Sequence, residues 1–206
     1  MTRLPAPIAE ALQTLTSSEA APQDIVLAVS SILELERGFE GLGRAVEAFR
    51  EASRSLGILE ESRSGQRLAD SWAKLSRFFL APLKGGHAVV SRRGSILAEA
   101  PPGREVLAAR WERLVPEVEA FLAEEKAIDR GFAESSVSAH VSFKFRSRLL
   151  LLDRRAERIK VGIDLVRSDL AAAARQGLAR LAVLLGSKPP HGARTEGAPS
   201  GSGGGG

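Results

Sequence analysis

Residues 25–49 read IVLAVSSILELERGFEGLGRAVEAF, and this stretch decides the fold. One row of apolar side chains recurs every seven residues from Ile25, and a second row recurs every seven residues from Ala28. Four heptads of this kind predict a helix of roughly 30 residues, about 45 Å long, with an apolar seam along one side. We expect two copies of the chain to associate through this seam, whose members are Ile25, Ile32, Leu35, Phe39, Leu42, Val46 and Phe49.

Two further stretches carry apolar residues at helical spacing without interruption. Residues 68–79 predict a helix that ends before Pro82, because proline disfavours helical backbone in the residue before it. Residues 149–170 predict a long helix that runs on to Gly186, since glycine followed by prolines is a common helix end.

A third stretch, residues 107–132, has the same spacing with two irregularities. Glu125 occupies one position of the apolar seam, and Pro116 lies inside the helix. Because proline removes one backbone hydrogen bond, we expect a kink or break near Leu114. Together the sequence predicts an all-α fold, an elongated antiparallel bundle of three to four long helices with coiled-coil-like seams.

The distribution of glycine and proline predicts how the chain is organised. We expect residues 1–22 to form an N-terminal arm with one short helix, and residues 23–185 to form the helical bundle domain. Prolines and glycines across residues 81–103 predict a long loop inside this domain. Residues 186–206 contain eight glycines and three prolines, so we expect a disordered tail.

One segment alternates like a strand. Apolar and polar residues take turns over residues 137–146, and the only candidate partner strand is the stretch 87–97. We favour a helix over 137–146, because long helices flank it and an isolated strand is marginally stable.

The charged side chains are unevenly distributed. The net charge is +4, from 29 basic and 25 acidic residues, but residues 137–167 hold eight basic and only three acidic groups. Residues 117–134 are predominantly acidic. If these segments pair antiparallel, Glu125 lies near Arg148 and Glu119 lies near Arg154, and the charges fix the register.

The alternative is that the basic segment binds an external anion. A row of cations along one rigid helix can hold acidic lipid headgroups at about 1 kcal/mol per basic side chain. The residues of this candidate anion or lipid site are Lys144, Arg146, Arg148, Arg154, Arg155, Arg158 and Lys160.

Composition excludes several classes of function. The 206 residues are 44% hydrophobic and 26% charged, which fits one soluble domain, and the absence of cysteine excludes disulfides and thiolate chemistry. No segment is apolar enough for a membrane span or a signal peptide, so we expect a cytoplasmic protein, in the lipid-binding interpretation one peripheral to a membrane. Catalytic, metal-binding and nucleotide-binding motifs are missing, so we expect no catalytic residues, no metal and no cofactor.

Three short motifs carry weaker hypotheses. Lys84 to His87 resembles a glycine turn that could cradle an anion, and Ser95 follows two arginines as serine kinases prefer. The alternation of phenylalanine and basic residues over 143–146 is typical of surfaces that stack nucleic-acid bases. For each motif a purely structural explanation is favoured, and a nucleic-acid partner is not expected.

Three functions remain. We expect first a non-catalytic structural or adaptor protein that self-associates into a homo-oligomer and binds a protein partner. The alternative is a peripheral membrane protein that binds anionic lipid through its basic helix, with an architecture like that of curved BAR-type dimers. Nucleic-acid binding is the third hypothesis.

Overall fold

The computed structural model describes residues 2–59, 64–91, 96–134 and 139–186. These residues are mostly helical, which confirms the all-α prediction. The elements in chain order are β1 (Arg3–Pro5), α1 (Ala6–Thr16), α2 (Pro22–Ser55), α3 (Gly65–Leu75), the π-helical turn η1 (Ser76–Leu80), α4 (Ala81–Ser91), β2 (Leu97–Glu99), α5 (Glu105–Glu134) and α6 (Ala139–Gly186). Two of the hypotheses concern residues outside the described ranges: the phosphorylation motif at Ser95 and the tail after Gly186.

Local signals set the ends of the helices. Pro22 occupies the first turn of α2, where its missing N–H costs no hydrogen bond. Asp24 in the first turn and Arg54 in the last turn have the charges that the helix dipole favours. Helix α3 follows Ser64, whose side-chain oxygen accepts a 3.3 Å hydrogen bond from the backbone N–H of Arg67.

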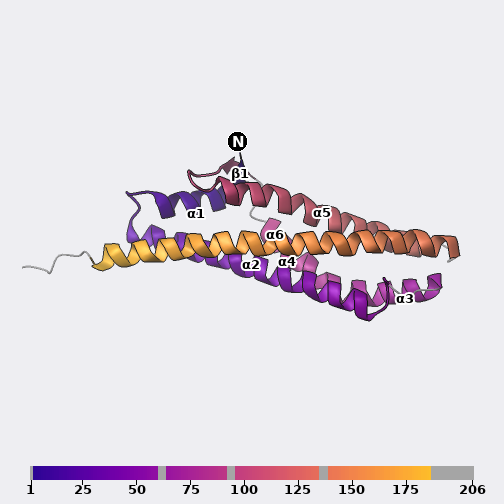
Figure 1. The fold of residues 1–206 in the computed structure, drawn as a ribbon. Helices are drawn as coiled ribbons and strands as arrows, with labels where there is room; N and C mark the ends of the chain where they lie inside the picture. The colour runs from indigo at the N-terminus through magenta and orange to yellow at the C-terminus, as the bar shows by residue number, and fades with distance from the viewer. Residues whose placement is uncertain (1, 60–63, 92–95, 135–138, 187–206) are drawn as a thin grey trace, which may run out of the picture.

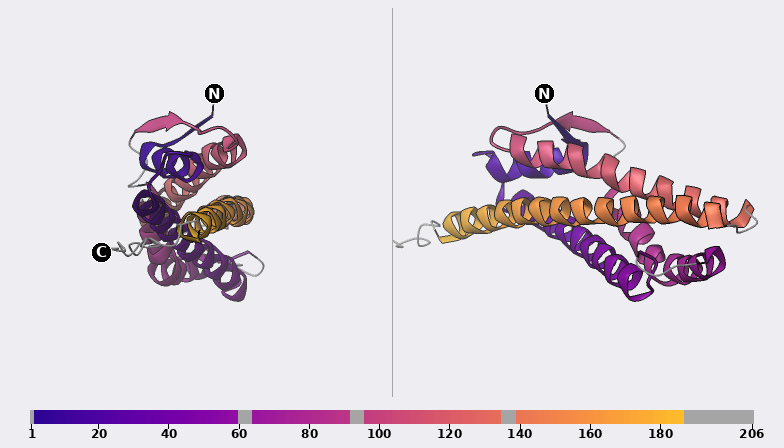
Figure 2. Two further views of the ribbon diagram at one scale, coloured as in Figure 1. Left: turned by 90° about the vertical axis from the view of Figure 1, so that its left-hand side faces the viewer. Right: turned by 45° about the vertical axis from the view of Figure 1, so that its right-hand side comes forward.

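The three long helices α2, α5 and α6 lie side by side along the molecule (Figure 1). Helix α6 packs against α2 on one side and against α5 on another, and the end-on view shows that the three helices are not in one plane (Figure 2). Arg54 of α2 pairs with Asp153 of α6, and Glu36 of α2 pairs with Arg167 of α6. The chain direction of α6 is therefore opposite to that of α2.

All seven side chains of the seam in residues 25–49 are buried inside the single chain. The ring of Phe39 meets that of Trp111 edge to face with centroids 5.2 Å apart, and Phe49 meets Phe121 in the same way. The prediction that this seam joins two copies is therefore wrong. Helices α1, α4 and α6 pack on α2, and α5 adds the rings of Trp111 and Phe121 to the seam. Helix α4 was not expected from the sequence.

The predicted loop over residues 81–103 is wrong in its first half, where residues 81–91 form α4. The preceding turn, η1, is π-helical, and such a wider turn accommodates Pro82, which has no N–H to donate. Gly86 lets α4 approach α2 closely, because a Cβ at this position would lie 3.2 Å from Leu42 Cα. Residues 84–87 are therefore helical, so neither the favoured loop nor the alternative anion-binding turn forms there.

A two-stranded ribbon joins the N-terminus to the middle of the chain. β1 and β2 pair antiparallel, with Arg3 opposite Glu99 and Leu4 opposite Ala98. Of the described residues near the stretch 87–97, those of β2 are extended, and they pair with β1 and not with residues 137–146. Residues 139–146 belong to α6, which confirms the helical interpretation of that part of the segment.

The N-terminal residues contribute to the core. Leu4 is fully buried, and the expected short helix exists as α1, whose side chains Ile8, Leu12 and Leu15 are buried against α2 and α6. Helix α5 is continuous through Pro116, so the predicted break near Leu114 does not occur. Proline costs the helix a hydrogen bond, but the apolar residues on both sides of it are buried and hold the two halves in one helix.

Candidate functional site

The basic residues predicted as one anion site point to several sides of α6 and have different partners. Towards α5, Arg148 Nε lies 2.6 Å from Glu124 Oε1, and Arg155 and Arg158 both lie 3.4 Å from Glu117 Oε2. The expected pairing of the basic and acidic helices is therefore found, but with Glu124 and Glu117 as the acidic partners. The predicted partners Glu125 and Glu119 are wrong, because Glu125 is buried in the core and Glu119 points to another side of α5.

The remaining basic residues are divided between other contacts and solvent. Arg146 donates to the backbone oxygen of Leu59, at 2.8 Å from Nη2. Lys160 lies 2.6 Å from Asp164 and 3.8 Å from Glu47 of α2. Lys144 and Arg154 are exposed, with no hydrogen bond or ion pair to the described residues. The seven residues therefore do not form one continuous cationic face.

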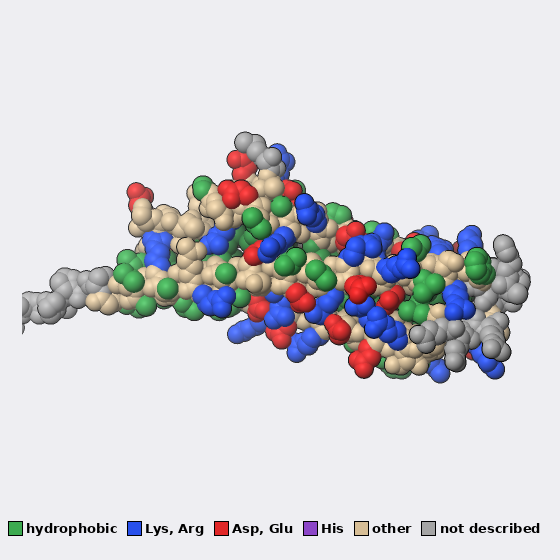
Figure 3. Space-filling view, viewed as in Figure 1, with side chains coloured by type: hydrophobic (Ala, Val, Ile, Leu, Met, Phe, Trp, Pro, Cys, Tyr) green, Lys and Arg blue, Asp and Glu red, His purple; other side chains and the backbone are tan. Residues whose placement is uncertain are grey.

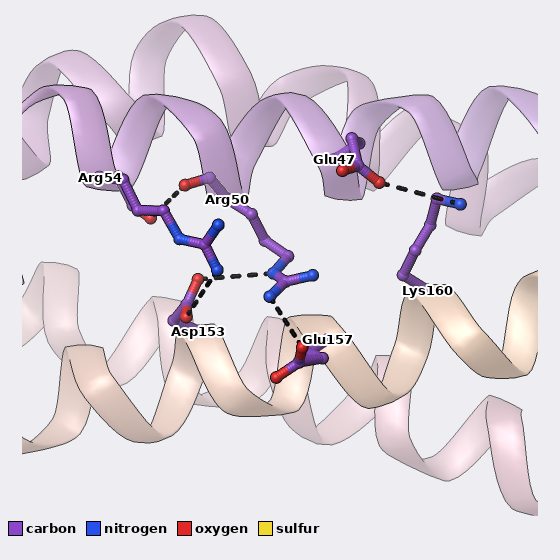
Figure 4. Close-up of polar contacts among 7 residues, drawn as sticks. Glu47, Arg50, Arg54, Asp153, Glu157 and Lys160 are labelled. Atoms are coloured by element: carbon purple, nitrogen blue, oxygen red, sulfur yellow. Dashed lines mark hydrogen bonds and ion pairs between the residues drawn. The ribbon is translucent and has the colours of Figure 1, made fainter.

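A second set of ion pairs joins α6 to α2 and was not predicted from the sequence (Figure 4). Arg50 of α2 lies 3.7 Å from Asp153 and 3.2 Å from Glu157, and Arg54 lies 3.9 Å from Asp153. The side chains of Arg50 and Asp153 are each only 14% exposed. Asp153 and Glu157 thus face α2. Arg148, Arg155 and Arg158 face α5 instead.

Between α5 and α6 lies a groove of about 570 Å³ whose rim is rich in arginine. Leu114, Pro116, Ala120, Gly162 and Leu165 provide its apolar surface. Gly162 allows the helices to approach here, because a Cβ at this position would lie 3.0 Å from Leu114 Cδ1. Leu165 is 42% exposed and so offers apolar surface to a ligand. We call this feature the α5–α6 groove.

Four arginines and two glutamates line the α5–α6 groove: Arg110, Arg113, Arg155, Arg158, Glu112 and Glu117. Arg110 Nη1 donates to both carboxylate oxygens of Asp169, each at 2.7 Å. Arg155 and Arg158 share the carboxylate of Glu117. Arg113 is exposed and has no partner among the described residues. The rim therefore carries an excess of positive charge beside apolar surface, an arrangement suited to a ligand that is both acidic and apolar.

The surface view shows where the charges lie. Basic and acidic side chains intermingle over the middle of the molecule, whereas hydrophobic side chains gather towards the C-terminal end of α6 (Figure 3). Sequence reasoning identified Arg155 and Arg158 of the groove but missed Arg110 and Arg113. These two flank the buried Trp111 on α5, and their spacing of three residues, which places them on one helix face, is the signal that could have found them.

A second polar cluster surrounds Glu125, the acidic residue in the seam of α5. Its side chain is fully buried, and Oε1 accepts hydrogen bonds from Lys84 Nζ at 2.8 Å and from Ser76 Oγ at 3.2 Å. Nearby, Trp72 Nε1 donates a 2.5 Å hydrogen bond to Asp129 Oδ1. Burial raises the pKa of the Glu125 carboxyl, and Asp129 adds to this, although the hydrogen bond and charge of Lys84 oppose it.

This cluster was not found from the sequence, because Lys84 was expected in a loop. Ser76 comes from η1, inside the stretch predicted as a helix, and Lys84 comes from α4, which the prolines and glycines of this region concealed. Glu125 Oε2 has no hydrogen-bond partner among the described residues. None of the cavities described around the groove or the ribbon includes Glu125, so we interpret the cluster as a link between α4 and α5.

Within the described residues, no group of three or more histidine, aspartate or glutamate side chains is arranged to hold a metal ion. None of the described helices combines the length and apolar character needed to cross a bilayer.

Comparison of the chain with protein-family models, curated protein sequences and solved structures finds no match in any of the three. The function is therefore argued from the α5–α6 groove itself.

Proposed function

We propose that the protein is a non-catalytic helical adaptor, an elongated antiparallel bundle that binds an acidic amphipathic segment of a protein partner in the α5–α6 groove. The observation that supports this most directly is the combination of exposed Leu165, an apolar floor and the exposed cation Arg113 in one groove. A helix with leucines on one face and glutamates beside them would bury the leucines and pair with the arginines.

A protein partner is favoured over an anionic membrane. An anionic membrane surface is bound best by a continuous row of cations that have no acidic partners. In this protein, Arg148, Arg155 and Arg158 pair with acidic residues of α5. A groove between two helices, with charge on its rim, matches a single inserted segment better than a flat surface.

A nucleic-acid partner has less support. Of the two phenylalanines in residues 143–146, Phe145 is buried and its ring stacks on that of Phe132 with centroids 4.2 Å apart. Only Phe143 is exposed, so the segment offers one ring where a base-stacking platform uses several.

The test is a fluorescence-anisotropy titration with labelled model peptides of about 20 residues. One peptide carries leucine on one helix face and glutamate on the other, and its matched control carries lysine in place of glutamate. We expect saturable binding of the acidic peptide only, weakened about fivefold by R113Q, which is about 1 kcal/mol, and progressively by added salt.

The control variant is R37Q, which removes an exposed arginine of α2 that has no partner among the described residues. It should leave the affinity for the acidic peptide unchanged. Phosphatidylserine vesicles form a separate arm. Vesicle binding without binding of the acidic peptide would contradict the adaptor proposal and favour the membrane function.

A further inference from the structure

A second cavity, of about 310 Å³, lies on the other side of α5, under the β1–β2 ribbon. The ribbon, α4 and α5 enclose it, and its apolar walls are formed by Pro5, Val90, Leu97, Trp111, Val115 and Pro116. Val90 is 3% exposed and Trp111 is 5% exposed, so these two side chains also belong to the hydrophobic core. A concave, mostly apolar cavity of this size with a few polar groups is typical of small-molecule sites.

One residue of the cavity lining carries a covered polar atom that lacks a partner among the described residues. His87 of α4 lines the cavity, and its Nε2 is buried without a hydrogen bond to any described residue. A buried ring nitrogen without a partner loses the hydrogen bond that water would supply, and a ligand group at this position would restore it. The close contact of Gly86 with Leu42 fixes α4 on α2 and so holds His87 at the cavity.

The charges around the cavity are mainly acidic. Glu112 and Glu119 of α5 and Arg3 of β1 are the charged residues of its lining. Glu112 Oε1 accepts a 2.6 Å hydrogen bond from the backbone N–H of Arg3, and the side chain of Arg3 lies opposite Glu99 in the ribbon. Glu119 is exposed and has no partner among the described residues, so its carboxylate is available to a cation.

We propose that this cavity binds a small hydrophobic amine. Its apolar body lies against Trp111 and Val115, and its ammonium group pairs with Glu119. The covered imidazole of His87 turns towards the ligand, so that Nε2 accepts a hydrogen bond from one of its N–H groups. The amine rather than an acid is favoured because carboxylates outnumber cations in the lining. This site is separate from the α5–α6 groove, although Glu112 and Pro116 contribute to the walls of both.

The test uses the two tryptophans of the full chain as reporters in ¹⁵N–¹H spectra. The side chain of Trp111 lines the cavity, whereas the indole N–H of Trp72 is bonded to Asp129 and serves as an internal control. The W72F variant assigns the two signals. The probes are phenethyl, indolylethyl and cyclohexylethyl scaffolds, each as the amine, the alcohol and the carboxylate.

We expect at least one amine to shift the Trp111 signal saturably, to leave the Trp72 signal in place, and to bind at least tenfold more tightly than the matched carboxylate. H87L and E119Q should each weaken this binding at least fivefold. The matched control E51Q removes an exposed carboxylate of α2 and should not change it.

Because Glu119 is exposed, E119Q keeps the test valid even if H87L fails to fold. The proposal is overturned if no amine binds up to its solubility limit, if amine and carboxylate bind equally, or if E119Q and E51Q have the same effect. These outcomes are independent of the acidic-peptide titration, so this site and the adaptor function can fail separately.

Discussion

Lys84 Nζ donates a 2.8 Å hydrogen bond to Glu125 Oε1, and this pair joins α4 to α5. The two ends of the pair differ in their surroundings, since the lysine side chain is 43% exposed and the glutamate side chain is fully buried. The carboxylate therefore bears most of the desolvation cost, and Oε2 adds to it by having no partner among the described residues. The contact holds the two helices in register more than it stabilises the fold.

The first prediction concerns the pH dependence of stability. Burial raises the pKa of Glu125 above its ordinary value of 4.5, so between the two values the folded chain holds a proton that the unfolded chain releases. The contribution of Glu125 to the free energy of unfolding is therefore lost as the pH rises through the raised pKa. Urea unfolding across this range should show E125Q gaining stability relative to the wild type as the pH rises. A difference between E125Q and the wild type that stays constant across this range would contradict this.

The second prediction uses two neighbouring glycines of α4. A Cβ at Gly85 would meet nothing within 4 Å, whereas a Cβ at Gly86 would lie 3.2 Å from the backbone of Leu42. G85A should stabilise the fold by about 0.5–1 kcal/mol, because alanine favours the helix. G86A should be at least about 1 kcal/mol less stable than G85A, since α4 would have to move from α2. Thermal unfolding compares the two, and equal effects would show that this contact is wrong.

The third prediction separates an internal seam from a dimer seam. Phe39 is 1% exposed, so F39A should lower the free energy of unfolding by about 3–5 kcal/mol. The matched variant F143A removes a ring that is 73% exposed and should change it by less than about 0.5 kcal/mol. Because the seam packs within one chain, the F39A loss should not depend on protein concentration. A loss that shrinks as concentration rises would indicate that the seam joins two copies.

The long helices could be predicted from the sequence because their periodicity is strong and continuous. The heptads from Ile25 to Phe49 are buried on one face of α2, as expected for a seam. What covers that face could not be predicted. The same apolar row fits a second copy or a short helix of the same chain. Helix α4 was hidden by Pro82, Gly85 and Gly86, of which Gly86 serves close packing.

The candidate site was predicted only in part. The opposite charges of residues 117–134 and 137–167 correctly indicated pairing between α5 and α6. The exact partners were missed, because Glu125 turns into the core and Glu124 and Glu117 take the pairing positions. A difference of one helix position moves a side chain by about 100° around the axis, which decides whether a charge meets solvent, a partner or the core.

The central claim, that the α5–α6 groove binds an acidic partner segment through its arginines, is tested most directly by a charge exchange. The R113E variant should lose affinity for the leucine–glutamate peptide and gain affinity for the leucine–lysine peptide, at least tenfold in the ratio of the two dissociation constants. R37E, which reverses an exposed charge on α2, should leave that ratio unchanged. If R113E and R37E change the ratio equally, the groove is not where the peptide binds and the account is contradicted.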